Sequence, residues 1–328
     1  MQKIFLFILL AMTGQQVFAQ VYSSKQPLAH TFSIVARDEQ TGELGVGVQS
    51  HWFSVGTVVS WAEAGTGAIA TQSFVNKSFG PRGLELLRKG MGAQQVLETL
   101  IKEDEASEVR QLAIVDRDGN VATHTGKNCI QYASHITGQH FSVQSNMMLT
   151  DKVNTAMADA FKKSAGKPLS ERILLSLEAA QKAGGDIRGQ QSAALLIVPA
   201  QSEGKPWDER TIDLRVDDAA QPLKELRRLL TVHTAYQHMN NGDLAIEKNE
   251  MDKAMQEYSA AMKLMPSNLE MQYWTAVTLA NNKQVAKAIP IFQKVFALDK
   301  NWKELTRRLP EVKLLTVNDA DLKRILAL

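Results

Sequence analysis

The 328-residue sequence contains one cysteine, Cys129, and so cannot form an internal disulfide bond. Without disulfides, the protein must rely on packed cores for its stability. Neither sign of charge dominates, because 37 lysines and arginines are balanced by 35 aspartates and glutamates, a net charge of +2. No basic stripe with interleaved aromatic residues is present either. Nucleic acid and anionic membranes are therefore not expected as partners.

Motifs of several enzyme classes are also missing. The histidines at positions 51–140 lack HExxH or paired-cysteine spacing, so no metal site is predicted. These residues are His51, His124, His135 and His140. A dinucleotide-binding fingerprint needs a helix directly after its glycines, and no helical pattern follows Gly42–Gly47. We expect neither a metal nor an organic cofactor.

The one long apolar run lies at the start of the chain. Lys3 precedes apolar residues 4–12, and Val17-Phe18-Ala19 supplies a small-residue cleavage pattern. The run is short for a bilayer span, which needs about 20 apolar residues. We predict a signal peptide over residues 1–19 and a linker or propeptide over residues 20–30; a buried N-terminal helix is the alternative. The mature protein is then exported, periplasmic or extracellular, without membrane contact after signal removal.

The composition and the secondary-structure pattern of the chain change near residue 225. Residues 30–218 mix glycine-punctuated strand patterns with helical patterns, and no glycine occurs after Gly242. Strands are predicted over residues 32–37, 44–50, 55–62, 67–72, 111–116, 121–125, 141–145, 192–198 and 211–216. Helices are predicted over residues 80–90, 93–103, 153–164 and 169–183. Antiparallel strand sets with paired helices between them predict an α+β fold, a four-layer αββα sandwich over residues 31–228.

The second part of the chain contains an internal repeat with the spacing of tetratricopeptide (TPR) repeats. The first copy consists of Gly242, Ala254, Tyr258, Ala261 and Pro266. The second copy consists of Ala276, Ala288, Phe292, Val295 and Lys300. We predict two TPR-like repeats with a capping helix over residues 231–315, and a tail or helix over residues 316–328. A protein or peptide partner is expected for such repeats, and an unrelated helical hairpin is the alternative.

Five ordered blocks in the first part carry a family resemblance. They are residues 31–38 (TFSIVARD), 41–48 (TGELGVGV), 67–73 (GAIATQS), 80–84 (GPRGL) and 183–194 (AGGDIRGQQSAA). Through these blocks the stretch from Thr31 to Leu230 resembles the DUF1028 family, a family of unknown function. Its members are assigned to the N-terminal nucleophile (Ntn) hydrolase-like fold, so the resemblance implies an Ntn-hydrolase-like sandwich.

In such a fold Thr31 is the candidate nucleophile. An Ntn enzyme attacks an amide carbonyl with the side chain of its first residue, and the free α-amine, titrating near ~8, acts as base. Thr31 becomes N-terminal only if the chain is also cut between His30 and Thr31. Without that cut, Thr31 is a structural strand residue, which is the other interpretation.

Polar residues near the predicted strand ends complete the candidate site. Asn146 is the second catalytic candidate, and Ser33 lies on the same strand face as Thr31. Asp186 and Arg188 follow a glycine pair and either bind the charged groups of a small substrate or pin a loop. The remaining substrate-binding candidates, as oxyanion donors or plain loop residues, are Ser50, Gln72 and Asn76.

Three functions are compatible with these features. The first is an exported Ntn-type amidohydrolase that acts on a small amide or peptide. The second is an inactive Ntn-fold binding or assembly module that uses its TPR-like repeats for protein interaction. The third is an unprocessed Ntn-fold enzyme of cyclohydrolase type. The sequence leaves open whether the protein is a monomer or a homo-oligomer.

Overall fold

A computed structural model describes residues 28–328. The predicted signal peptide and residues 20–27 of the predicted linker lie outside this range. Within it, one sheet contains β1 (Leu28–Ala29), β4 (Ser60–Glu63), β5 (Gly67–Phe74), β6 (Arg110–Asp116) and β7 (Val121–Thr125). A second sheet contains β2 (Thr31–Arg37), β3 (Leu44–Ser50), β8 (Ser134–Gly138), β9 (Phe141–Ser145), β10 (Ser192–Val198) and β11 (Ile212–Val216).

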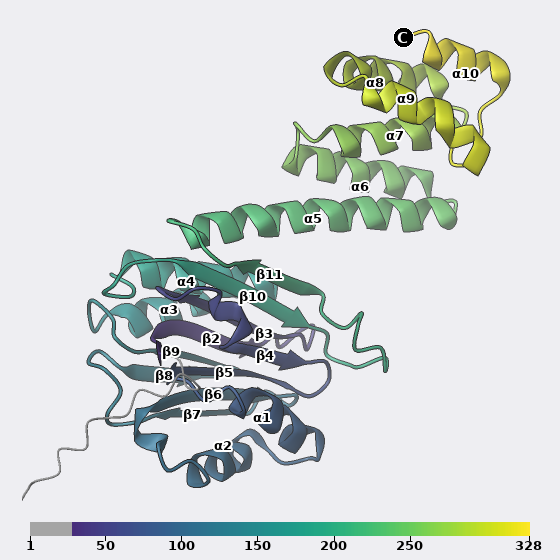
Figure 1. Cartoon of the computed structure of the whole chain (residues 1–328). Helices are drawn as coiled ribbons and strands as arrows, with labels where there is room; N and C mark the ends of the chain where they lie inside the picture. The colour runs from purple at the N-terminus through teal and green to yellow at the C-terminus, as the bar shows by residue number, and fades with distance from the viewer. Residues whose placement is uncertain (1–27) are drawn as a thin grey trace, which may run out of the picture.

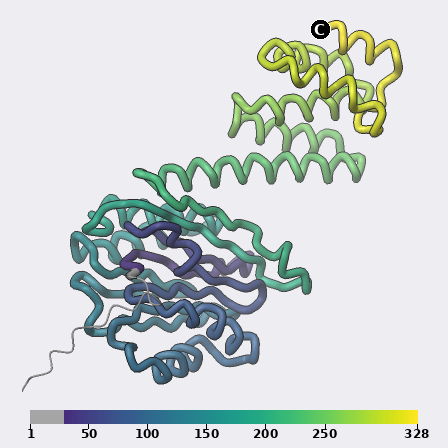
Figure 2. The backbone as a smooth tube through the Cα atoms, viewed as in Figure 1, coloured from purple at the N-terminus to yellow at the C-terminus, as the bar shows by residue number. Residues whose placement is uncertain are grey.

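Both sheets are antiparallel throughout their described strands. The first has the order β1-β5-β6-β7, with β4 also paired to β5, and the second has the order β11-β10-β3-β2-β9-β8. The early strands β2 and β3 are therefore flanked by strands from much later in the chain (Figure 2). Thr31 begins a central strand rather than an edge.

Helices cover the outer face of each sheet (Figure 1). Helices α1 (Phe79–Arg88) and α2 (Ala93–Lys102) pack on the first sheet, and α3 (Val153–Lys163) and α4 (Leu169–Lys182) pack on the second. The four layers follow the order α, β, β, α. The predicted combination of antiparallel sheets with paired helices is confirmed.

Because the side chains of a strand alternate, β2 contributes to the packing on both faces of its sheet. Phe32 and Ile34 enter the core beneath α3 and α4, whereas Val35 points toward the other sheet. The neighbouring β3 brings α4 close because it carries glycine on its helix side. A Cβ atom on Gly47 would lie 2.3 Å from the Ile173 side chain of α4. The Gly-rich pattern of this strand is thus a packing requirement of the helix above it.

Two local features within residues 31–228 differ from the prediction. The strand predicted over residues 55–62 is wrong in its first half, because Val55–Thr57 forms a 3-10 turn and β4 begins only at Ser60. The Val55 N–H donates to the Ser192 hydroxyl at 3.0 Å instead of to a strand neighbour. Strand β8 was not predicted, since all five of its residues are partly or fully exposed and carry no continuous apolar pattern.

Six helices follow the second sheet in the described chain and stack away from the sandwich (Figure 1). They are α5 (Pro222–Glu247), α6 (Met251–Leu264), α7 (Leu269–Asn281), α8 (Val285–Leu298), α9 (Asn301–Arg308) and α10 (Asp319–Leu326). Helix α5 passes through the predicted boundary at residues 228–231 without a break. Its Leu226 and Leu230 belong to the sandwich core, and its Met239 belongs to the helical core. One helix therefore joins both cores.

Eight of the ten repeat positions are buried in the helical stack, and the other two, Pro266 and Lys300, are exposed. A Cβ atom on Gly242 would lie 2.4 Å from the ring of Tyr258, so glycine permits the close contact of α5 with α6. Phe292, which stands in the second copy where Tyr258 stands in the first, is also fully buried. The assignment of these helices to the TPR class stays a prediction. Among the helices of residues 28–328, none has the length and apolar character to cross a bilayer.

Candidate active site

The layer between the two sheets is apolar at one end and polar at the other. Val46 and Ala68 belong to the apolar end, and inward-facing positions change to hydroxyl and amide residues toward the start of β2. The polar side chains there are Thr31, Ser33, Ser50, Gln72, Gln111, Gln144 and Asn146, all fully buried. Buried polar groups need hydrogen-bond partners, so this end of the sandwich must form a network.

Gln111 fixes the direction of that network. Its Nε2 donates to the backbone carbonyls of Ser134 at 3.2 Å and Ser145 at 3.0 Å, which can only accept. Its Oε1 therefore faces the other way and accepts from Gln72 Nε2 at 2.7 Å and Asn146 Nδ2 at 2.9 Å. Since the Asn146 amide nitrogen is used as a donor, its Oδ1 is left as an acceptor on the opposite side.

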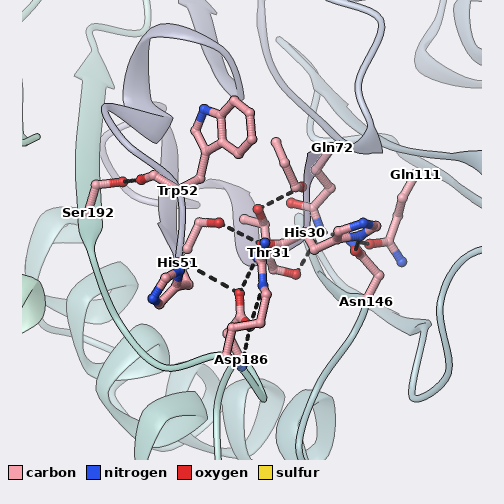
Figure 3. Close-up of polar contacts among 12 residues, drawn as sticks. His30, Thr31, His51, Trp52, Gln72, Gln111, Asn146, Asp186 and Ser192 are labelled. Atoms are coloured by element: carbon pink, nitrogen blue, oxygen red, sulfur yellow. Dashed lines mark hydrogen bonds and ion pairs between the residues drawn. The ribbon is translucent and has the colours of Figure 1, made fainter. Parts of the chain in front are cut away.

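That acceptor meets His30. The distance between Asn146 Oδ1 and His30 Nδ1 is 2.7 Å, so the network assigns the histidine proton to Nδ1 (Figure 3). Burial is the largest influence and lowers the pKa of His30. The hydrogen bond with Asn146 opposes this shift, the Arg188 charge adds to it, and the Asp186 charge has the smallest, raising effect. The ring also meets Phe74 edge-on, with centroids 5.5 Å apart. His30 is held as a neutral hydrogen-bond donor.

The leader segment, defined here as Leu28–His30, is built into the sandwich. Strand β1 pairs with the end of β5, with Leu28 opposite Phe74 and Ala29 opposite Ser73. Ala29 and His30 are almost completely buried. The Thr31 hydroxyl donates to the Ala29 carbonyl at 2.8 Å. In the uncut chain, the candidate nucleophile is therefore covered by the residues just before it.

The carbonyl of His30 accepts two hydrogen bonds. The Ser50 hydroxyl donates at 2.5 Å and Arg188 Nη2 donates at 2.8 Å. Ser50 reaches this carbonyl because the pairing of β2 with β3 places it opposite Thr31. Two donors on one carbonyl oxygen, one of them charged, withdraw electron density from the carbon of the His30–Thr31 peptide bond.

Asp186 holds Arg188 in that position. Its Oδ2 accepts from Arg188 Nη2 at 2.7 Å and from the His51 N–H at 3.2 Å, and its Oδ1 accepts from Arg188 Nε at 3.0 Å. The carboxylate is fully buried, whereas the Arg188 side chain is partly exposed. The loop can turn this tightly because Gly184 and Gly185 have φ angles of 122° and 61°.

Seven of the eight predicted site residues lie in this cluster. Ser33 is among them, and its hydroxyl donates to Gln72 Oε1 and accepts from Gln144 Nε2, both at 2.6 Å. Asn76 does not join them. Its Oδ1 accepts from the Ser78 N–H at 3.1 Å and its Nδ2 donates to Asp104 Oδ2 at 3.0 Å, so it anchors the loop before α1.

The prediction missed His30, Gln111 and Gln144. His30 was assigned to a linker, and its burial depends on the pairing of β1 with β5. The two glutamines could have been found from the sequence. Each is a polar residue at an inward-facing position close to one end of its strand, as Gln72 is. Across residues 28–328, no group of three or more His, Cys, Asp or Glu side chains is placed to hold a metal ion.

Comparison with known proteins identifies the family. Residues 31–226 match the model of DUF1028, a family of unknown function, and this is more than half of the chain. The chain belongs to this family, as the sequence blocks predicted. A crystal structure of a DUF1028 protein from Silicibacter pomeroyi is similar, with a TM-score of 0.57 and 28% identity over 63% of this chain and 87% of that chain.

A second solved structure is more distant. Anbu, an ancestral beta-subunit from Yersinia bercovieri, aligns with a TM-score of 0.31 and 11% identity over 60% of this chain and 92% of that chain. These values are too low to carry an argument about this protein. No curated protein matches the chain.

Proposed function

We propose that this protein is an Ntn-type amidohydrolase that cuts its own His30–Thr31 bond and then uses Thr31 as its nucleophile. One observation carries the proposal: the carbonyl before Thr31 accepts hydrogen bonds from Ser50 at 2.5 Å and Arg188 at 2.8 Å. Such donors stabilise the negative charge that a carbonyl oxygen gains during nucleophilic attack.

The cut exchanges an amide for an ester. The Thr31 hydroxyl first leaves the Ala29 carbonyl, and its oxygen then bonds to the His30 carbonyl carbon while the C–N bond breaks. The hydroxyl proton passes to the departing Thr31 nitrogen. Water then hydrolyses the ester, which leaves a carboxylate on His30 and both a free hydroxyl and a free α-amine on Thr31.

The same groups then serve a substrate amide. The α-amine of Thr31 takes the hydroxyl proton during attack, and Ser50 and Arg188 receive the substrate oxygen in place of the His30 carbonyl. The Thr31 backbone is held for this role, because its carbonyl accepts from the Asn146 N–H at 3.1 Å and from Gln72 Nε2 at 3.3 Å. A small amide or peptide is the proposed substrate class.

Intact mass measured over time on the purified full chain tests the proposal. The wild type and Thr31→Ser should split between residues 30 and 31, and Thr31→Ala should stay whole. A wild-type chain that stays whole but hydrolyses amides would favour the unprocessed enzyme. One that stays whole and inactive would favour the binding module.

A further inference from the structure

We propose that the leader occupies the acyl side of the substrate site as the enzyme's own first substrate. Preferred substrates are then peptides with histidine or asparagine, whose side chains donate a hydrogen bond, directly before the cleaved bond. The inference rests on the proposed function, because it treats the His30–Thr31 bond as the model for later substrates. It adds the identity of the residue that the site selects.

The position of the His30 carbonyl defines the acyl pocket. A substrate carbonyl that binds between Ser50 and Arg188 directs its acyl side chain to the place where the His30 ring now lies. That place has one polar wall and one aromatic wall. Asn146 Oδ1 lies 2.7 Å from Nδ1 of the ring, and Phe74 meets the ring at an interplanar angle of 88°.

The polar wall offers a hydrogen-bond acceptor to the pocket and no donor. The orientation of the Asn146 amide is fixed through Gln111 by two backbone carbonyls, so Asn146 Oδ1 always faces the pocket. An imidazole N–H or an asparagine amide satisfies this oxygen. Aspartate would place a negative oxygen against it, and leucine would leave it buried without a partner.

The backbone of the leader shows how a longer peptide would lie. Strand β4 covers β5 only as far as Ala70, and β1 continues the same edge at Ser73 and Phe74. Removal of the leader frees this stretch of β5 for another extended chain. A substrate that extends toward its N-terminus therefore gains backbone hydrogen bonds that a single amino-acid amide cannot make.

The uncut full chain provides the first test. The rate of the cut is measured by intact mass in wild type, His30→Asn, His30→Asp and His30→Leu. Asparagine and aspartate have nearly the same shape, so this pair isolates the donor requirement. We expect wild type and His30→Asn to cut at similar rates, and the other two to be slower by about tenfold or more. Equal rates in all four would overturn the inference and leave the proposed function intact, whereas an uncut wild type would overturn both.

A second test varies the peptide and keeps the protein, so it does not depend on the folding of position-30 variants. Anilides of Gln-Pro-Leu-Ala-X, with X as His, Asn, Asp or Leu, are added to the self-cut wild-type protein. The ratio kcat/KM should be about tenfold or more higher for His and Asn than for Asp and Leu. The variant Asn146→Ala should lose the preference for His over Leu. Hydrolysis without any preference at X would contradict the inference.

Discussion

The hydroxyl of Ser50 lies 2.5 Å from the carbonyl oxygen of His30, 20 residues earlier in the sequence. The antiparallel pairing of β2 with β3 places Ser50 opposite Thr31 and so brings the two groups together. Arg188 reaches the same oxygen from a third segment of the chain. Three distant parts of the sequence thus converge on the one peptide bond whose cleavage would free Thr31.

Removal of the Ser50 hydroxyl should slow the cut. In Ser50→Ala, the His30 carbonyl keeps only the Arg188 donor, and we expect a rate loss of about 100-fold, the typical effect of one oxyanion donor. The rate is measured by intact mass. The matched control is Ser192→Ala, because Ser192 is a buried serine opposite Ser50 on β10 and contacts Val55 and Trp52 instead. Similar losses in both variants would contradict a specific role for Ser50.

Asp186 should affect the rate of the cut because it holds Arg188 in position. The change Asp186→Asn keeps the shape but removes the charge that holds the guanidinium, and we expect the cut to slow by about tenfold as positioning is lost. Stability should also fall, by about 1–3 kcal/mol for a disturbed buried hydrogen-bond network. Urea unfolding in a Thr31→Ala background separates the two effects. A chain that is less stable but cuts at the wild-type rate would show that Asp186 only pins its loop.

Much of the fold could be predicted because the relevant signals are local. Alternation in residues 32–37 and 44–50 identifies two strands, and the Asp118-Gly119 turn joins two others with Gly119 at a φ angle of 84°. The turn at Val55–Thr57 is different. It depends on the Ser192 hydroxyl, which is 137 residues away, and nothing in the local apolar pattern reveals it.

The site, too, could be predicted where its signals are local and not where it depends on long-range contacts. Polar residues at strand ends mark Gln72 and Asn146, but strand order decides whether such ends meet, and one sequence does not contain it. For this reason, the place of His30 in the site could not be predicted from the sequence. Its burial depends on β1 joining β5, and its tautomer depends on a chain of amides that runs through Gln111 to the backbone.

The stability of the uncut chain should fall in mild acid. Burial lowers the pKa of His30 in the folded chain, while the unfolded chain keeps an ordinary value near about 6.5. Below that pH the unfolded state binds a proton that the folded state does not, so stability is lost as the pH falls. Burial also lowers the pKa of His135, with a further contribution from His124, and burial lowers the pKa of His233, so parts of the effect belong to these two residues.

The share of His30 can be measured directly. Urea unfolding of Thr31→Ala is compared with Thr31→Ala/His30→Asn at about pH 7.5 and about pH 5, on either side of the ordinary histidine value. The double variant keeps a hydrogen-bond donor that cannot titrate, so it should lose less stability between the two pH values. Equal losses would mean that His30 does not titrate differently in the folded and unfolded chains.

Gly242→Ala should weaken the helical stack. The added Cβ atom would lie 2.4 Å from the Tyr258 ring, and we expect a loss of about 1–3 kcal/mol in the free energy of unfolding, as for other overpacked sites. Asn241→Ala on the same helix is the control, because Asn241 is exposed. Thermal unfolding distinguishes them. If both variants unfold like the wild type, α5 and α6 can separate without cost and the close contact is not important.

The proposed function depends on a cut between His30 and Thr31 that the chain's own residues make. The most direct measurement is the intact mass of the wild-type protein, expressed from its full sequence and purified beside its Thr31→Ala variant. We expect a wild-type chain that begins at Thr31 and a variant that still carries residues 20–30. A wild-type chain that begins at Gln20, with amide hydrolysis unchanged in Thr31→Ala, would contradict it.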